Sequence, residues 1–109
     1  MAITIAKASL FLTELLEVLE DLYWESPSIT VKNQCFNVVR LLQQEITELT
    51  KVSVQDHHYD YELIACSVSD MSQCLEDLSR FISNEALRTR TRNHLTPLLE
   101  KSKKVFAKG

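Results

Sequence analysis

Glycine is almost absent from this chain. The only glycine among the 109 residues is Gly109, the last one. A β-rich domain of this size needs glycine for the positive φ angles of hairpin turns and bulges, so its absence argues against a sheet. Proline is scarce too, and both prolines, Pro27 and Pro97, stand where a helix could begin. These two scarcities favour an all-α fold.

Long apolar runs and a secretion signal are also missing. No stretch approaches the roughly 18 apolar residues of a membrane span, and the apolar start at residues 1–7 is short and runs into glutamates. Cys35, Cys66 and Cys74 form no CxxC pair and no His/Cys metal spacing, so we expect reduced thiols that pack as small hydrophobes. The sequence therefore predicts a soluble cytoplasmic protein without membrane contact, cofactor or metal.

Apolar residues repeat with the period of an α-helix in four segments. In residues 5–25 and 58–83 they fill an arc of about 160° on the helical wheel, and in residues 29–52 a narrower arc of about 100°. A fourth helix is expected to begin after Ser83 or Asn84, either of which can cap it, and to continue to the lysine-rich end of the chain.

Short connections join these segments. Proline disfavours helical geometry in the residue before it, so the first helix should end at Ser26, and Ser26 or Ser28 can cap the second. Residues 53–57 are the expected loop before the third helix. Within the fourth helix, Pro97 should kink the helix or split it. Because short connections favour antiparallel neighbours, we predict a single domain over residues 1–109, an antiparallel up-down-up-down four-helix bundle.

Charge is divided unevenly along the chain. Residues 1–79 carry four basic and thirteen acidic side chains, a net charge of −9, whereas residues 80–109 carry eight basic and two acidic ones, a net charge of +6. The basic fourth helix can be neutralised by the acidic outer faces of the first and third helices, or it can bind an acidic partner. No aromatic residues lie between Arg88, Arg90 and Arg92, which argues against nucleic acid as the partner.

Motifs that carry catalysis are weak or absent. P-loop, nucleophile-elbow and dinucleotide fingerprints need internal glycine, and the expected core faces are almost purely apolar. Residues 56–62 are rich in metal-capable side chains, with His58 and Glu62 at the i, i+4 spacing, but the helix dipole already explains acidic residues in a first helical turn. We therefore expect neither a metal site nor an enzyme.

One catalytic alternative stays open. Arg88 and His94 fit the R-x(4–6)-H spacing of the HEPN class of four-helix RNases, in which an arginine and a histidine act together on a scissile phosphate. His94 also lies at the edge of the apolar arc, where a half-buried structural histidine is the commoner interpretation. The alternative function is therefore a small RNase that uses Arg88 and His94.

Apolar residues on polar faces are the best candidates for binding. Trp24 and Leu10 lie among acidic residues on the first helix; Trp24 can pack over the following turn or anchor a partner, as tryptophan often does. Arg88, Arg90 and Arg92 are the basic candidates. We predict a non-catalytic helical protein–protein interaction module: an adaptor, inhibitor or immunity-type regulator. A self-associating structural protein, such as a homodimer, is a further alternative, because arcs of about 160° exceed a narrow bundle seam.

Overall fold

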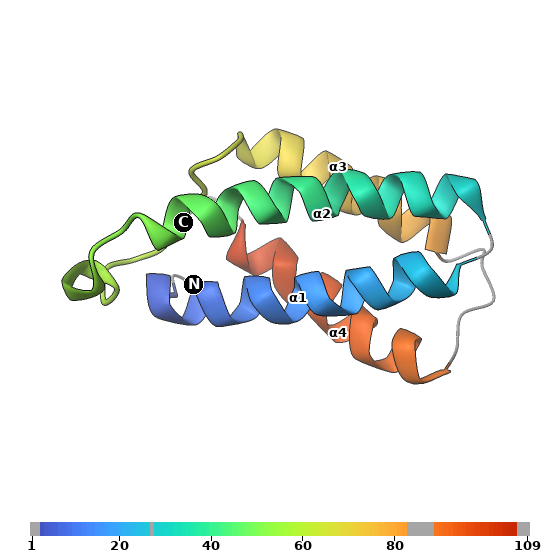
Figure 1. The fold of residues 1–109 in the computed structure, drawn as a ribbon, viewed down its shortest axis with the longest axis horizontal. Coiled ribbons are helices and arrows are strands. Elements are labelled where there is room, and N and C mark those ends of the chain that lie inside the picture. Colours follow the sequence, from blue (N-terminus) through green and yellow to red (C-terminus); the bar gives the residue numbers. More distant parts are fainter. Residues whose placement is uncertain (1–2, 27, 83–88, 107–109) are drawn as a thin grey trace.

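The computed structural model describes residues 3–26, 28–82 and 89–106. They form four α-helices and one short 3-10 helix: α1 (Ile5–Glu25), α2 (Ile29–Thr50), η1 (Val54–Asp56), α3 (Val68–Ile82) and α4 (Thr89–Val105). These ranges contain no strand, only an isolated β-bridge between Thr4 and Asp60. The predicted all-α class is confirmed, and the four helices pack around one apolar core (Figure 1).

α1 and α2 are the most closely packed pair, and they lie side by side along the long axis of the molecule (Figure 1). Apolar residues recur every three or four positions in both helices, so each helix buries one face. The buried apolar side chains of this pair are Ala8, Phe11, Leu12, Leu15, Val18, Leu19 and Leu22 of α1, and Val31, Cys35, Val38, Leu41, Leu42 and Leu49 of α2. α3 packs on α2 and α4 packs on α1, whereas α3 and α4 touch only sparsely.

The turn between α1 and α2 is closed by its own side chains. α1 ends at Glu25, as predicted, and the Ser26 N–H donates to the carbonyl of Leu22 at 3.0 Å. Ser28 is the N-cap of α2, where its hydroxyl oxygen accepts a hydrogen bond from the Val31 N–H at 3.3 Å. Of the two predicted caps for the second helix, Ser28 is the one that the structure uses.

The third helix is shorter than the sequence predicts. Apolar periodicity indicates a helix over residues 58–83, but α3 begins at Val68, and residues 57–67 are irregular. The prediction was wrong because Tyr61 and Leu63 reach the core without being helical, so the apolar pattern continues past the helix. The backbone of this segment instead forms a hydrogen bond to a residue far away in the chain: the Tyr61 N–H donates to the carbonyl of Ile3 at 2.8 Å.

α4 is continuous from Thr89 to Val105 although it contains Pro97, so the helix is not split there. A kink at Pro97 stays a prediction. The expected caps Ser83 and Asn84 lie outside the described residues. Across the parts of the chain that the structure describes, no helix combines the length and the hydrophobicity that crossing a membrane requires.

Candidate interaction surfaces

The outer face of α1 carries two large apolar side chains that no other helix covers. Leu10 is 74% exposed and Trp24 is 77% exposed. They are fourteen residues apart, close to four helical turns, so they share one face at a separation of about 21 Å. Three acidic residues lie between them on the same face, at intervals of three or four positions: Glu14, Glu17 and Asp21. We call this set, Leu10 to Trp24, the α1 stripe.

Trp24 stands at the end of α1 rather than folding over the turn. Its ring and the neighbouring Tyr23 ring form a T-shaped pair with centroids 5.2 Å apart, and the Lys32 ammonium lies 5.3 Å from the centre of the Tyr23 ring. Just across the turn, Ile29 is 75% exposed at the start of α2, and Phe36 follows two turns later on the same face of α2. This end of the molecule therefore presents several uncovered apolar groups.

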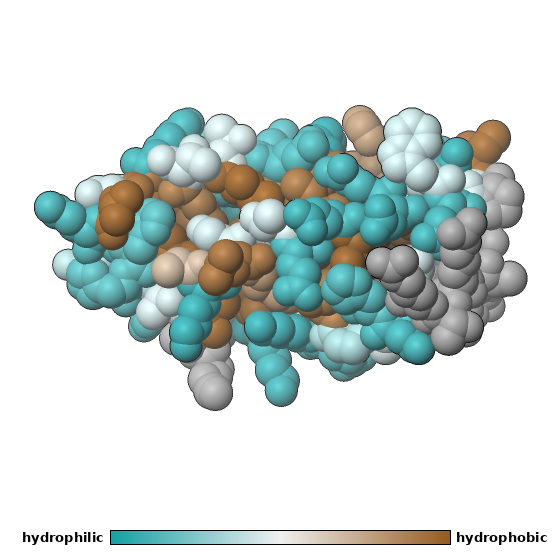
Figure 2. Space-filling model, turned by 60° about the horizontal axis from the view of Figure 1, so that its bottom comes forward, coloured by the Kyte–Doolittle hydropathy of each residue, from teal (hydrophilic) through white to brown (hydrophobic). Residues whose placement is uncertain are grey.

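One face of the molecule also carries apolar side chains among polar ones. Figure 2 shows hydrophobic side chains gathered in a broken band along the long axis, with hydrophilic side chains on both sides. A rim of polar residues around apolar ones is typical of protein-binding surfaces.

Arg88 and the side chains of Arg90 and Arg92, the arginine candidates, lie outside the part of the chain that the structure describes. Among the described residues, α4 touches the acidic α1 at three polar points. The Thr91 hydroxyl donates to Glu25 Oε2 at 2.6 Å, His94 Nε2 lies 3.3 Å from Glu14 Oε1, and Lys101 Nζ lies 5.3 Å from the centre of the Phe11 ring.

The RNase alternative gains no catalytic pair from these residues. His94 is exposed, at the surface rather than half-buried, and its ring nitrogen faces the Glu14 carboxylate. A carboxylate beside a histidine repels an incoming phosphate. Because Arg88 is outside the described residues, the meeting of Arg88 and His94 stays a hypothesis.

Glu45 on α2 is the functional-looking residue that sequence reasoning missed. It is fully buried, in a core that was expected to be almost purely apolar. Its carboxylate accepts a hydrogen bond from the Tyr61 hydroxyl at 2.6 Å, from the Ala65 N–H at 2.7 Å, and from the Ile64 N–H at 3.0 Å to each oxygen. Both oxygens of the buried carboxylate therefore have hydrogen-bond donors, as a polar group inside a protein requires.

A signal for Glu45 was present in the sequence. It lies three residues after Leu42 and four before Leu49, which places it inside the apolar arc of α2. An acid at such a position must find donors, and residues 57–67 supply them. Burial, followed by the hydrogen bond to Glu45, raises the pKa of the Tyr61 phenol far above its ordinary value of 10.0. The hydroxyl therefore stays a donor at every ordinary pH.

The segment that Glu45 holds also caps α1. The first N–H groups of a helix have no partner within it. Here the Ile5 N–H donates to the Tyr59 carbonyl at 2.9 Å and the Ala6 N–H to the His57 carbonyl at 3.1 Å. Because residues 57–62 are not helical, His58 and Glu62 do not share a helical face, and the predicted helix start there is wrong. The described residues contain no group of three or more metal-capable side chains.

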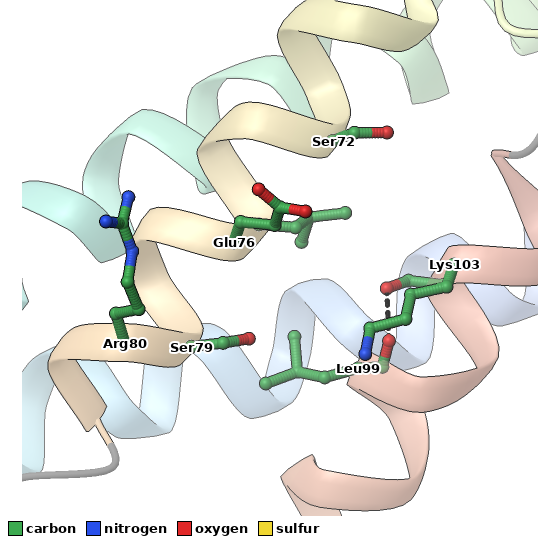
Figure 3. A pocket seen from close by; sticks show the side chains of 8 residues that line it. Ser72, Glu76, Ser79, Arg80, Leu99 and Lys103 are labelled. Carbon is green, nitrogen blue, oxygen red and sulfur yellow. Dashed lines mark hydrogen bonds between the residues drawn. The ribbon is translucent and has the colours of Figure 1, made fainter.

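A groove runs between α3 and α4, where the two helices touch sparsely. It has a volume of about 400 Å³. Leu75 and Leu99 form its apolar floor. Short hydroxyl side chains and charged ones surround this floor: Ser72, Ser79, Ser102, Glu76, Arg80 and Lys103. Figure 3 shows Ser72 and Ser79 pointing from α3 toward α4, and Leu99 pointing from α4 toward α3.

All three cysteines are free thiols, as expected. Cys35 is buried in the core, and burial raises its pKa to about 12; Cys66 and Cys74 are half-buried, and burial raises their pKa values as well. A thiol with a raised pKa stays protonated and is a poor nucleophile.

No protein-family model, curated protein or solved structure matches this chain. The surfaces of the molecule are therefore the basis on which its function is inferred.

Proposed function

We propose that this protein is a non-catalytic helical module that binds another protein, as an adaptor, inhibitor or immunity-type regulator does. The observation that carries the proposal is the exposure of Trp24, the only tryptophan of the chain, at 77%. Single exposed apolar residues are ordinary, but tryptophan is the residue type most enriched at binding hot spots. Burying a side chain of this size is worth about 1.5–3 kcal/mol, which a partner can use for affinity.

The α1 stripe indicates the chemistry of that partner. Glu14, Glu17 and Asp21 lie between Leu10 and Trp24 and favour a basic surface opposite them. Of these acids, only Glu14 has a described polar partner, His94. The stripe thus supports a partner that has a pocket for an indole ring and lysine or arginine around it.

The architecture fits a rigid presenting surface. We propose that the four helices follow an up-down-up-down order with α4 kinked at Pro97, and that the module works in the cytoplasm. α1 contributes seven buried side chains to the core, so its outer face is held on a rigid element. A rigid surface loses little conformational entropy when it binds.

The test is a capture experiment with purified protein as bait and Trp24 as the variable. Wild type, Trp24→Ala and Val54→Ala are compared against lysate. Val54 is a matched control because it is 83% exposed but lies at the other end of the molecule, in η1 (Figure 1). We expect proteins held by wild type and by Val54→Ala to be lost from Trp24→Ala by at least about tenfold, a change of about 1.4 kcal/mol.

Binding is then confirmed through the indole itself. Because Trp24 is the only tryptophan, its emission should shift to shorter wavelength when an identified, tryptophan-free partner covers it. An unchanged partner list in Trp24→Ala removes Trp24 from the binding surface.

Two other results would favour the alternative functions. Loss of an RNA-cleaving activity in Arg88→Ala and His94→Ala would establish the RNase alternative. A dimer in sedimentation equilibrium would favour self-association.

A further inference from the structure

The open seam between α3 and α4 has a cause in the sequence. The α3 positions that line the groove follow the i, i+3, i+4, i+7 spacing of one helical face: Ser72, Leu75, Glu76 and Ser79. Only one of these four is a leucine. Short hydroxyl side chains at seam positions leave space where leucines would interdigitate, and Ser102 does the same on α4. The short side chains at these seam positions therefore account for the groove.

Both walls of the groove carry charged side chains. Glu76 is exposed on the α3 wall, and Lys103 is exposed on the α4 wall, where its ammonium lies 3.4 Å from Glu100 of the same helix. Arg80, the other charge on the α3 wall, forms an ion pair with Asp77 of its own helix. No ion pair between described residues crosses the groove, so Glu76 and Lys103 do not meet.

The length and the lining of the groove suit a short helical segment. Its α3 wall extends from Ser72 to Ser79, about 10 Å or two helical turns. Its floor offers Leu75 and Leu99, each almost fully buried but still reachable from the groove. Helical partners recognise such grooves through apolar side chains at i, i+3 or i+4, and i+7.

We infer that this groove binds an amphipathic helix of a partner protein, one whose apolar stripe is flanked by basic residues on one side and acidic residues on the other. The basic flank lies along Glu76, and the acidic flank lies along Lys103. The apolar side chains enter the space beside Ser72, Ser79 and Ser102. This surface is separate from the α1 stripe, so the inference goes beyond the function proposed for Trp24.

Three synthetic peptides of about 15 residues test the charge pattern; peptides of this length are close to the lower limit for stable helices. All three have the same leucine stripe. The first has lysine on one flank and glutamate on the other, the second has glutamate on both, and the third has lysine on both. Fluorescence anisotropy of labelled peptides gives their affinities for the full chain. We expect the mixed peptide to bind about fivefold more tightly than either uniform one, equivalent to about 1 kcal/mol, the upper range of an exposed ion pair.

A change of one wall should change the preferred peptide. In Glu76→Lys both walls are basic, so the variant should prefer the peptide with glutamate on both flanks. Glu20→Lys on α1 is the matched control and should keep the preference for the mixed peptide. Both glutamates are exposed, so neither variant should alter the far-UV circular dichroism.

Filling the groove should remove binding without opening the core. Ser72→Trp places a large ring in the space, whereas Gln73→Trp places it on an exposed position of α3 that does not line the groove. We expect at least about a tenfold loss of affinity for the mixed peptide in Ser72→Trp only. In wild type, backbone amide shifts in NMR should change at Ser72, Ser79 and Ser102, while Trp24 emission stays constant.

Several outcomes overturn the inference. Equal affinity for the three peptides, no binding of any, or an unchanged preference in Glu76→Lys removes the charged groove as a helix site. Quenching or a shift of Trp24 emission by the mixed peptide places binding on the α1 stripe instead. None of these results removes capture of a partner through Trp24, so the two proposals fail separately.

Discussion

One connection joins α1 to α2 and another joins α2 to α3, and the two are held in different ways. The turn at residues 26–28 is closed by the Ser26 and Ser28 caps, within a few residues of the chain. The connection at residues 51–67 is held by Glu45, which lies in the helix before it, and by the first turn of α1. The first depends on local chemistry and the second on a buried side chain. Substitutions should therefore affect the two connections to different extents.

The largest effect is expected from Glu45→Ala. The substitution leaves the Tyr61 hydroxyl and the Ile64 and Ala65 N–H groups without their acceptor, and it opens a cavity in the core. We expect the free energy of unfolding to fall by about 3 kcal/mol, measured by urea denaturation followed by circular dichroism. Amide exchange at Ile64 and Ala65 should also accelerate.

Glu48→Ala is the control for this loss. Glu48 is one turn further along α2, and its carboxylate forms an exposed ion pair with Lys51 at 3.1 Å. Its removal should cost less than about 0.5 kcal/mol. Equal losses in the two variants would show that the buried carboxylate does not hold the connection.

A smaller effect is expected from Tyr61→Phe, which removes one donor to Glu45 and keeps the ring in the core. At neutral pH we expect a loss of about 1.5 kcal/mol, the lower range for a hydrogen bond to a charged group. The same urea denaturation measures it. A loss near zero would show that the two backbone donors suffice for Glu45.

The effect of Tyr61→Phe should also depend on pH. The folded-state pKa of Tyr61 is raised above the ordinary 10.0, so its contribution to stability is complete below pH 10 and is lost as the pH rises above it. The difference between wild type and Tyr61→Phe should therefore shrink to near zero by about pH 11, at up to about 1.4 kcal/mol per pH unit. The Cys35 thiol, whose pKa is also raised, is present in both proteins and cancels. If the difference in free energy of unfolding stays constant up to about pH 11, the pKa of Tyr61 is not raised by burial.

The smallest effect is expected at the short turn. Ser28→Ala removes the N-cap of α2 and should cost about 1 kcal/mol. Thr30→Ala, on an exposed position in the first turn of α2, is the control and should stay within about 0.5 kcal/mol of wild type. Amide exchange at Ile64 and Ala65 should be unchanged in Ser28→Ala, because the long connection has its own support.

The sequence was sufficient where local chemistry decides the structure. The apolar arcs placed α1 and most of α2, and the Ser26-Pro27 pair placed the end of α1 at Glu25. It was insufficient for residues 58–67, whose apolar spacing resembles that of a helix. Their backbone N–H groups bond instead to Glu45 and to Ile3, far away in the chain. Periodicity records which side chains are buried and not which acceptor a backbone group finds.

The candidate surfaces also differ in how far the sequence predicted them. Trp24 and Leu10 were chosen because they stand among acids on a helical wheel, and the structure leaves both of them exposed. The groove between α3 and α4 was not predicted, although serines at Ser72, Ser79 and Ser102 indicate a weak seam once the facing helix is known. Which positions face a neighbour depends on how the helices are placed, which a wheel does not contain.

By itself, the sequence determined the helical class, the positions of the long helices and the uneven charge, because glycine content, apolar spacing and capping act over a few residues. Only the tertiary structure decided that Glu45 is buried, that residues 57–67 cap α1, and that the α3–α4 seam stays open. Those features arise where segments far apart in the chain meet, and a buried polar group takes whichever donor that meeting brings within reach.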